Sequence, residues 1–234
     1  ENVGPGTARG GTITCPACGS TIGEKRYREL GRQGLLGERL YALVGRKAGS
    51  DERFYRGIED AELAAFEAAQ AAANELETRW DGRLSKFPDE LISQDEPRRL
   101  NIRQYGFENW GSLYNSRQQL AIAVLGDLVG EQQQAILAAG ASRELASAVA
   151  AVLALTVSNL THYMTNQSSY LSDGMISAFI QSSAIAMHAD YAEVNPLVEG
   201  LVGGFDYQLG KVSELLESLA GYSTSPGTVL RTPA

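Results

Sequence analysis

Cysteine and histidine are scarce in this sequence, since each occurs only twice in 234 residues. Two cysteines exclude a disulfide scaffold. The sequence also lacks a G-x-G-x-x-G turn after a strand, a Walker A loop, an H-E-x-x-H pair and a G-x-S-x-G elbow. Without those motifs, it shows no dinucleotide, phosphate-loop, zinc-protease or serine-hydrolase chemistry.

The first residue is Glu1, and no signal peptide follows it. We therefore expect a cytoplasmic chain that is part of a longer protein. The most apolar stretch, residues 145–160, is interrupted by Ser147, Thr156 and Asn159. A membrane span needs about 20 apolar residues, so this stretch predicts a central buried helix and no membrane partner.

Apolar residues make up 44% of the chain and charged residues 21%, which excludes disorder as the global state. The net charge is −8, but it is unevenly spread: residues 1–56 hold ten basic against six acidic residues, and residues 118–234 hold three against ten. A basic head on an acidic body suggests that the head faces a polyanion. Surface solubility alone would explain the same pattern.

Cys15 and Cys18 form a C-x2-C pair followed by Gly19. This spacing fits one edge of a tetrahedral zinc site, as in half of a zinc ribbon or knuckle. A closed site needs four ligands, so we expect the other cysteine pair to lie outside this chain and this half-site to be unoccupied by itself. Recruitment of His162 or His188, and a redox role for the pair, are the alternatives. Each histidine is otherwise interpreted as a helix-face or core residue rather than a catalytic base.

The remaining pattern predicts a mainly α, α+β chain in four parts. Residues 1–57 hold the half-ribbon and short strands, and residues 58–97 an Ala-rich helix capped by Asp60 and then a loop. Residues 98–222 hold a basic-aromatic loop and a helical, bundle-like subdomain with helices expected at 117–139, 142–166, 174–189 and 206–220. Residues 223–234 begin a strand.

Arginine and aromatic residues alternate over residues 98–117. Such alternation suits base stacking and phosphate contact in nucleic-acid binders. The alternative is a loop whose aromatic rings fill the core while its arginines face solvent. The predicted nucleic-acid contacts are Arg98, Arg99, Arg103, Tyr105 and Arg117.

Several short blocks occur in an order that resembles a known family. They are GTITCPACG (11–19), YG (105–106), WGSLYNSRQQL (110–120), DYAEVNP (190–196) and PGTVLR (226–231). Together they resemble the central part of large bacterial and archaeal DNA methylases that carry a zinc-ribbon module. The third and fourth blocks carry most of the resemblance, which covers most of the chain.

The resemblance implies an S-adenosylmethionine-dependent methyltransferase that acts on an amino group of DNA, of the adenine type. In that family a D-P-F-x-G-x-G cofactor loop lies upstream of the ribbon, and a D-P-P-Y catalytic motif lies downstream of the P-G-T-V-L-R strand. This sequence contains neither, and its Asn195-Pro196 is followed by Leu197-Val198. The resemblance therefore implies an insert of a Rossmann-like methyltransferase that supports DNA contact, uses the parent's cofactor and is not catalytic alone.

Two other functions remain open from the residues themselves. One is a stand-alone, non-enzymatic nucleic-acid-binding or adaptor module with a zinc-knuckle-like head. The other is a structural helical scaffold in which the cysteine pair is incidental.

Overall fold

The computed structural model describes residues 8, 9, 11–15, 18–47, 49, 50, 52–96, 98–171, 174, 176–180 and 184–222. In this part of the chain, five α-helices and two small antiparallel sheets make a mainly helical α+β protein. The predicted class is therefore confirmed. The strand expected in residues 223–234 lies outside the described residues.

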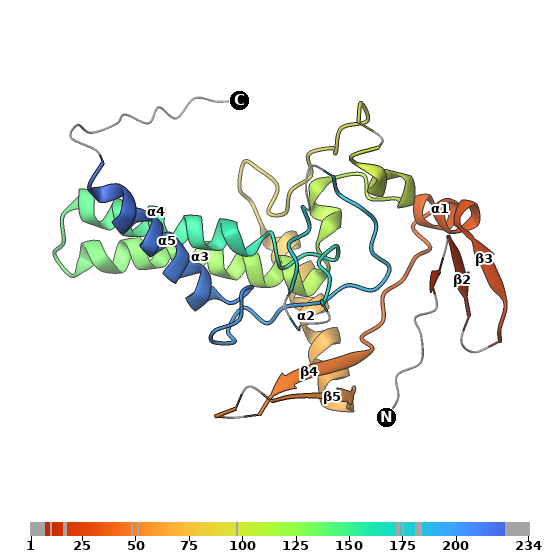
Figure 1. Ribbon diagram of the computed structural model, residues 1–234. Helices are drawn as coiled ribbons and strands as arrows, with labels where there is room; N and C mark the ends of the chain where they lie inside the picture. The colour runs from red at the N-terminus through yellow and green to blue at the C-terminus, as the bar shows by residue number, and fades with distance from the viewer. Residues whose placement is uncertain are drawn as a thin grey trace.

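The first sheet is small and lies at one end of the molecule (Figure 1). Strands β1 (Ala8–Arg9), β2 (Thr12–Thr14) and β3 (Thr21–Gly23) pair antiparallel in that order, and Ile13 lies opposite Ile22. Helix α1 (Glu24–Arg32) follows β3 directly. Helix α1 was not expected from the sequence. It has only nine residues, and Tyr27 and Leu30 are its only large apolar side chains, so its apolar face is too short to stand out from the Gly-rich residues around it.

A second sheet lies where short strands were expected. Strands β4 (Ala42–Arg46) and β5 (Arg53–Gly57) form a two-stranded ribbon in which Val44 is opposite Tyr55. Helix α2 (Asp60–Arg79) comes next and confirms the Ala-rich prediction. Its N-cap is Glu59 rather than the expected Asp60. The carboxylates of Glu59 and Glu62 accept the helix-start amides reciprocally, as a capping box does.

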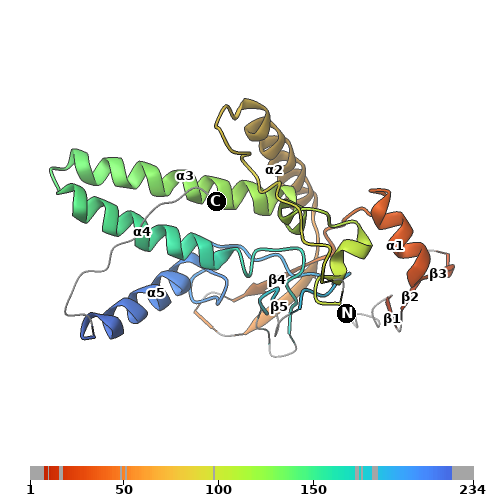
Figure 2. The same ribbon diagram turned by 90° about the horizontal axis from the view of Figure 1, so that it is seen from above.

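Three long helices form the elongated side of the molecule (Figures 1 and 2). They are α3 (Ser116–Ala138), α4 (Arg143–Leu160) and α5 (Phe205–Ala220). Asn115 caps α3, and Ser142 caps α4 by accepting from the Leu145 amide at 3.2 Å. In Figure 2, α4 lies between α3 and α5, with α3 also against α2.

Helix α4 is less buried than the sequence suggested. Only 22% of its residues are buried, and Leu145 and Leu155 are 54% and 53% exposed. The expectation of a central buried helix is therefore wrong, because only one face of α4 packs on its neighbours. By length and composition alone, α4 is the one helix among the described residues that could cross a membrane, a test that core helices also pass.

The helix expected at 174–189 does not form in its described residues, and α4 ends at Leu160 rather than near Asn166. The segment instead runs over the core and pairs with distant backbone. The Phe179 amide donates to the His162 carbonyl at 3.0 Å, and the Ile185 amide donates to the Arg99 carbonyl at 2.7 Å. Ile176 lies in one buried cluster and Phe179 and Ile185 lie in another, whereas Ile180 is exposed.

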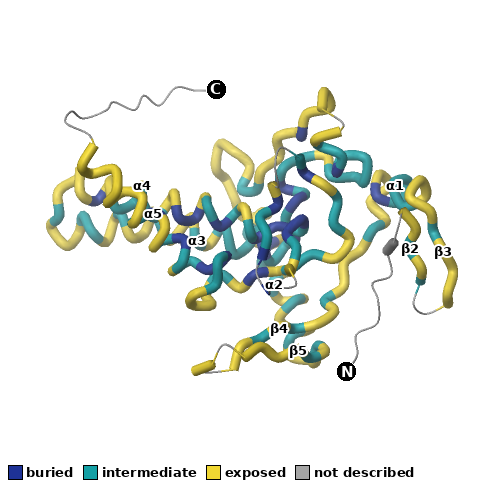
Figure 3. Tube along the Cα trace, in the orientation of Figure 1, coloured by how far each residue is buried: buried dark blue, intermediate teal, exposed yellow. Residues whose placement is uncertain are grey.

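Two clusters of buried side chains lie in the core, and Figure 3 shows that many of the buried residues gather near the centre of the molecule. The first contains Ile92, Ile102, Leu113, Phe179 and Ile185, and the second contains Leu160, Met164, Ile176 and Val194. Short 3-10 helices η1 (Asn101–Tyr105) and η2 (Trp110–Leu113) supply residues to the first cluster. These clusters fix the position of the basic-aromatic segment, which the sequence analysis treated as a loop.

Candidate functional site

The cysteine pair lies at the tip of the β2–β3 hairpin. The Gly19 amide donates to the Cys15 carbonyl at 2.9 Å, and the Cys15 amide donates to the Ser20 carbonyl at 2.8 Å. Gly19 has a φ of +72°, which glycine adopts without a Cβ penalty, so the chain turns back directly after Cys18. Both thiols are free, with Cys15 half-buried and Cys18 exposed.

The Cys18 sulfur lies 3.3 Å from the Ser20 hydroxyl oxygen. Hydrogen bonding, first from the Ser20 side chain and then from its backbone, lowers the pKa of Cys18 below the ordinary thiol value. A lowered pKa favours the thiolate, which is the form that binds metals. The Cys18 thiol is therefore more readily converted to a thiolate than an ordinary exposed thiol.

No group of three or more potential metal ligands forms among the described residues, which include both histidines. The His162 ring packs against Phe179, with centroids 5.5 Å apart, and His188 Nδ1 lies 2.9 Å from the Ser169 hydroxyl. Burial lowers the pKa of His188 below its ordinary value. Neither histidine therefore joins the cysteine pair in a group of three or more potential metal ligands among the described residues.

The five predicted nucleic-acid contacts do not form one surface. Arg98 and Arg99 are exposed in the turn before η1, and Arg99 lies 3.9 Å from Glu96 in an ion pair whose side chains are both more than half exposed. Arg103 instead donates to the backbone carbonyls of Ile92 and Glu108. It holds the loop before η1 onto the core, which is a structural role.

Tyr105 joins η1 to α1. Its hydroxyl donates to the Glu24 carboxylate at 2.8 Å, its ring lies 5.7 Å from the Tyr27 ring, and the Arg28 guanidinium lies 5.1 Å from its centre. The same interface requires glycine, because a Cβ on Gly31 would lie 2.0 Å from the Tyr105 carbonyl oxygen. The aromatic ring is thus engaged in packing rather than open for base stacking.

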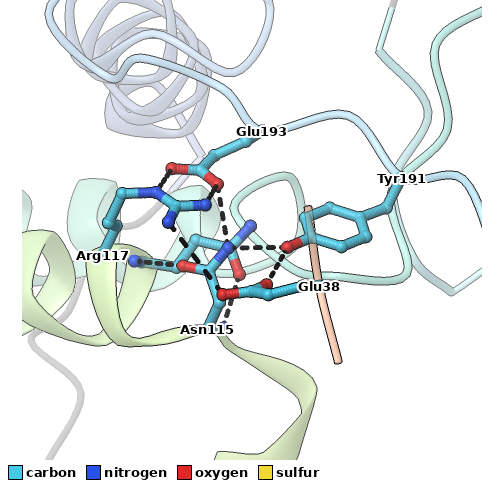
Figure 4. A network of polar contacts seen from close by, with 6 residues as sticks. Glu38, Asn115, Arg117, Tyr191 and Glu193 are labelled. Atoms are coloured by element: carbon cyan, nitrogen blue, oxygen red, sulfur yellow. Dashed lines mark hydrogen bonds and ion pairs between the residues drawn. The ribbon is translucent and has the colours of Figure 1, made fainter. Parts of the chain in front are cut away.

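Arg117 is the centre of a polar network at the start of α3 (Figure 4). Its guanidinium makes a bidentate contact with Glu193 at 2.7 and 2.5 Å, and it also lies 4.0 Å from Glu38. The guanidinium stacks 3.6 Å from the centre of the Phe66 ring of α2, and only 16% of the Arg117 side chain is exposed. Arg117 therefore joins α2, α3 and the segment around residue 193.

Asn115 and Tyr191 complete this network. The Asn115 side-chain amide donates to the Tyr191 hydroxyl at 2.9 Å and to Glu193 at 2.8 Å, while its oxygen caps α3. The Tyr191 hydroxyl donates in turn to Glu38. Burial, and then the Glu38 hydrogen bond, raise the pKa of Tyr191, so the hydroxyl remains a donor.

The network brings together the two blocks that carry most of the resemblance. Asn115 and Arg117 come from residues 110–120, and Tyr191 and Glu193 from residues 190–196. The 11–19 and 105–106 blocks both approach α1, since a Cβ on Gly11 would lie 3.6 Å from Glu24 and the Tyr105 hydroxyl donates to the same carboxylate, and the 226–231 block lies outside the described residues. Sequence analysis missed Glu38 and Phe66, because no local pattern links them to Arg117.

Comparisons with models of protein families, with curated proteins and with solved structures find no match to this chain.

Proposed function

We propose that this chain is the central insert of an S-adenosylmethionine-dependent DNA methyltransferase of the amino, adenine-directed type. In this role it contributes DNA contact and structural support, and it is not catalytic alone. The observation that carries the proposal is the contact of Asn115 and Arg117 with Tyr191 and Glu193. These residues belong to separate blocks of the resemblance, and their contact supports treating the blocks as parts of one structural unit.

The cysteine hairpin supports the same assignment. In the proposed protein, Cys15 and Cys18 hold zinc together with a second cysteine pair of the parent protein, and the parent supplies the S-adenosylmethionine site. A Rossmann-like core would lie beside the helical part, and the whole protein would act in the cytoplasm. The exposed Arg98 and Arg99 are the two originally predicted DNA contacts whose geometry leaves them accessible.

The coding sequence on either side of this chain tests the proposal directly. We expect a D-P-F-x-G-x-G segment before Glu1 and a D-P-P-Y segment after Ala234. The absence of both from an uninterrupted reading frame would favour the stand-alone binding module instead. Methyl transfer from labelled S-adenosylmethionine to duplex DNA by this chain alone would contradict the non-catalytic role.

DNA binding supplies a second test, measured by fluorescence anisotropy of a labelled 20-base-pair duplex over a range of salt concentrations. Each phosphate contact changes the slope of log K against log salt by about 0.9. The Arg98→Ala/Arg99→Ala variant should therefore reduce the slope by about two. An unchanged slope would remove Arg98 and Arg99 from the DNA contacts.

A further inference from the structure

We infer that helix α1 and the turn before η1 form one basic surface that binds the phosphate backbone of duplex DNA. Its contacts are Lys25 and Arg32 on α1, together with Arg98 and Arg99. This inference rests on the proposed function and assigns the DNA contact to a helix whose residues the sequence analysis did not single out.

Lys25 and Arg32 project from the same side of α1, because seven residues correspond to about two helical turns. Both residues are exposed. The other basic residues of α1 are paired within the helix: Arg28 with Glu24 at 2.5 Å and Arg26 with Glu29 at 3.4 Å. Within the described part of the chain, no ion pair engages Lys25 or Arg32. The uncompensated positive charge of α1 therefore lies on this side.

The packing of η1 on α1 brings Arg98 and Arg99 to the same end of the molecule. Tyr105 binds Glu24, and the backbones of Gly31 and Gly106 approach so closely that a Cβ on Gly106 would lie 2.2 Å from the Gly31 carbonyl oxygen. Arg98 precedes η1 by three residues, which span at most about 11 Å. Figure 1 shows the yellow-green segment that contains η1 beside one end of α1.

Two carboxylates beside this basic surface, Glu24 and Glu96, both have cationic partners, and the partner of Glu96 binds it only weakly. Glu24 accepts from both Tyr105 and Arg28, and these contacts lower its pKa, the Tyr105 hydrogen bond most. The side chains of Arg99 and Glu96 are both more than half exposed, and ion pairs of this kind contribute little to stability. A phosphate group can therefore replace Glu96 as the partner of Arg99. The surface can therefore accept an anion without burying an unpaired acid.

The spacing of the two helix residues suits a nucleic-acid backbone. Seven residues of α-helix rise about 10.5 Å, while a DNA strand advances about 3.4 Å per phosphate. Lys25 and Arg32 are thus separated by about three phosphate steps along the axis. The acidic remainder of the chain, with three basic against ten acidic residues over 118–234, repels DNA and orients it toward α1.

The test compares Lys25→Gln/Arg32→Gln with Arg83→Gln/Arg143→Gln, a control that removes the same charge from exposed positions off this surface. Binding of a labelled 20-base-pair duplex is measured by anisotropy between 50 and 200 mM salt, and circular dichroism checks the fold of each variant. The α1 variant should lower the salt slope by about two, and the control should lower it by less than half a unit. Since the substitutions are at exposed positions, both variants should keep the wild-type spectrum.

The outcomes separate this inference from the proposed function. A wild-type chain that binds the duplex through Arg98 and Arg99, with the α1 variant unchanged, overturns the inference alone. Equal losses in the α1 variant and the control also overturn it, because they indicate a general charge effect. A wild-type chain that does not bind the duplex removes both the inference and the DNA-contact role. Flanking sequence without either methylase motif removes the methyltransferase assignment while leaving the duplex contact standing.

Discussion

At the scale of single residues, arginines of this chain differ mainly in what surrounds the guanidinium. Arg103 and Arg117 are surrounded by carbonyls, carboxylates and an aromatic ring, and they join segments of the core. Arg32 and Arg98 are exposed. Charge and residue type are the same in both groups, so only the partners separate a structural arginine from a candidate DNA contact.

Replacing Arg117 tests its structural role. Arg117→Met removes the bidentate partner of Glu193 and leaves the carboxylates of a partly buried network without their cation. We expect the free energy of unfolding to fall by about 2 to 3 kcal/mol, measured by urea denaturation. Arg26→Met, which breaks an exposed pair, should change it by less than about 0.5 kcal/mol. Weaker duplex binding by Arg117→Met at unchanged stability would instead favour the predicted DNA contact.

Glu62 gives the chain a defined acid sensitivity. The Arg56 hydrogen bond, followed by that of the Glu59 amide, lowers the pKa of Glu62 from 4.5 to about 2. Because the folded pKa is the lower one, the stabilising contribution is complete above about pH 4.5 and is lost as the pH falls toward 2.

The pH dependence of Glu62→Gln checks this assignment. The stability difference between wild type and variant, from urea unfolding at each pH, should be constant above about pH 5 and should shrink as the pH approaches 2. Glu67→Gln removes the same charge from the same helix without touching Arg56, and serves as the control. A difference that does not depend on pH between 5 and 2 would contradict the role of the Arg56 contact.

At the scale of elements, local sequence patterns were sufficient to predict helices α2, α3, α4 and α5. The Ala-rich stretch predicted α2, and the helices expected at 117–139, 142–166 and 206–220 correspond to α3, α4 and α5. The expected helix at 174–189 is wrong because Ile185 pairs with the backbone of Arg99, a contact 86 positions away that no local pattern encodes. The Cys15–Cys18 pair was likewise recognised from local spacing, whereas the Arg117–Glu193 contact spans 76 positions and was missed.

Alanine substitution should have opposite effects on stability at Gly31, which lies in the contact between α1 and η1, and at Gly126, which lies on α3 away from any neighbour. Gly31→Ala places a methyl group 2.0 Å from the Tyr105 carbonyl oxygen, so backbone must shift and stability should fall by about 2 to 4 kcal/mol. Gly126→Ala, in open space on α3, should raise stability by about 0.5 to 1 kcal/mol through helix propensity. Urea unfolding of both variants measures the difference. A stabilised Gly31→Ala variant would show that α1 and η1 do not approach this closely.

At the scale of the whole molecule, the cysteine hairpin and the hydrophobic core are separate. The two buried clusters contain no residue of β1, β2, β3 or α1, although α1 packs on η1. The cysteine thiols and the basic residues of α1 therefore lie at one end of the molecule, and the helices α3, α4 and α5 extend from the other. Changes at the hairpin should leave the helical part intact.

Cys15→Ser/Cys18→Ser tests this separation. We expect its urea unfolding curve, followed by helical circular dichroism, to match wild type within about 0.5 kcal/mol, because no core contact is removed. Wild type offers zinc two thiolates and no third ligand among the described residues, so it should bind well under one ion per monomer. The double variant should lose that residual binding. Stoichiometric zinc on a wild-type monomer would contradict the half-site, and a large loss of helical stability in the variant would show that the hairpin supports the core.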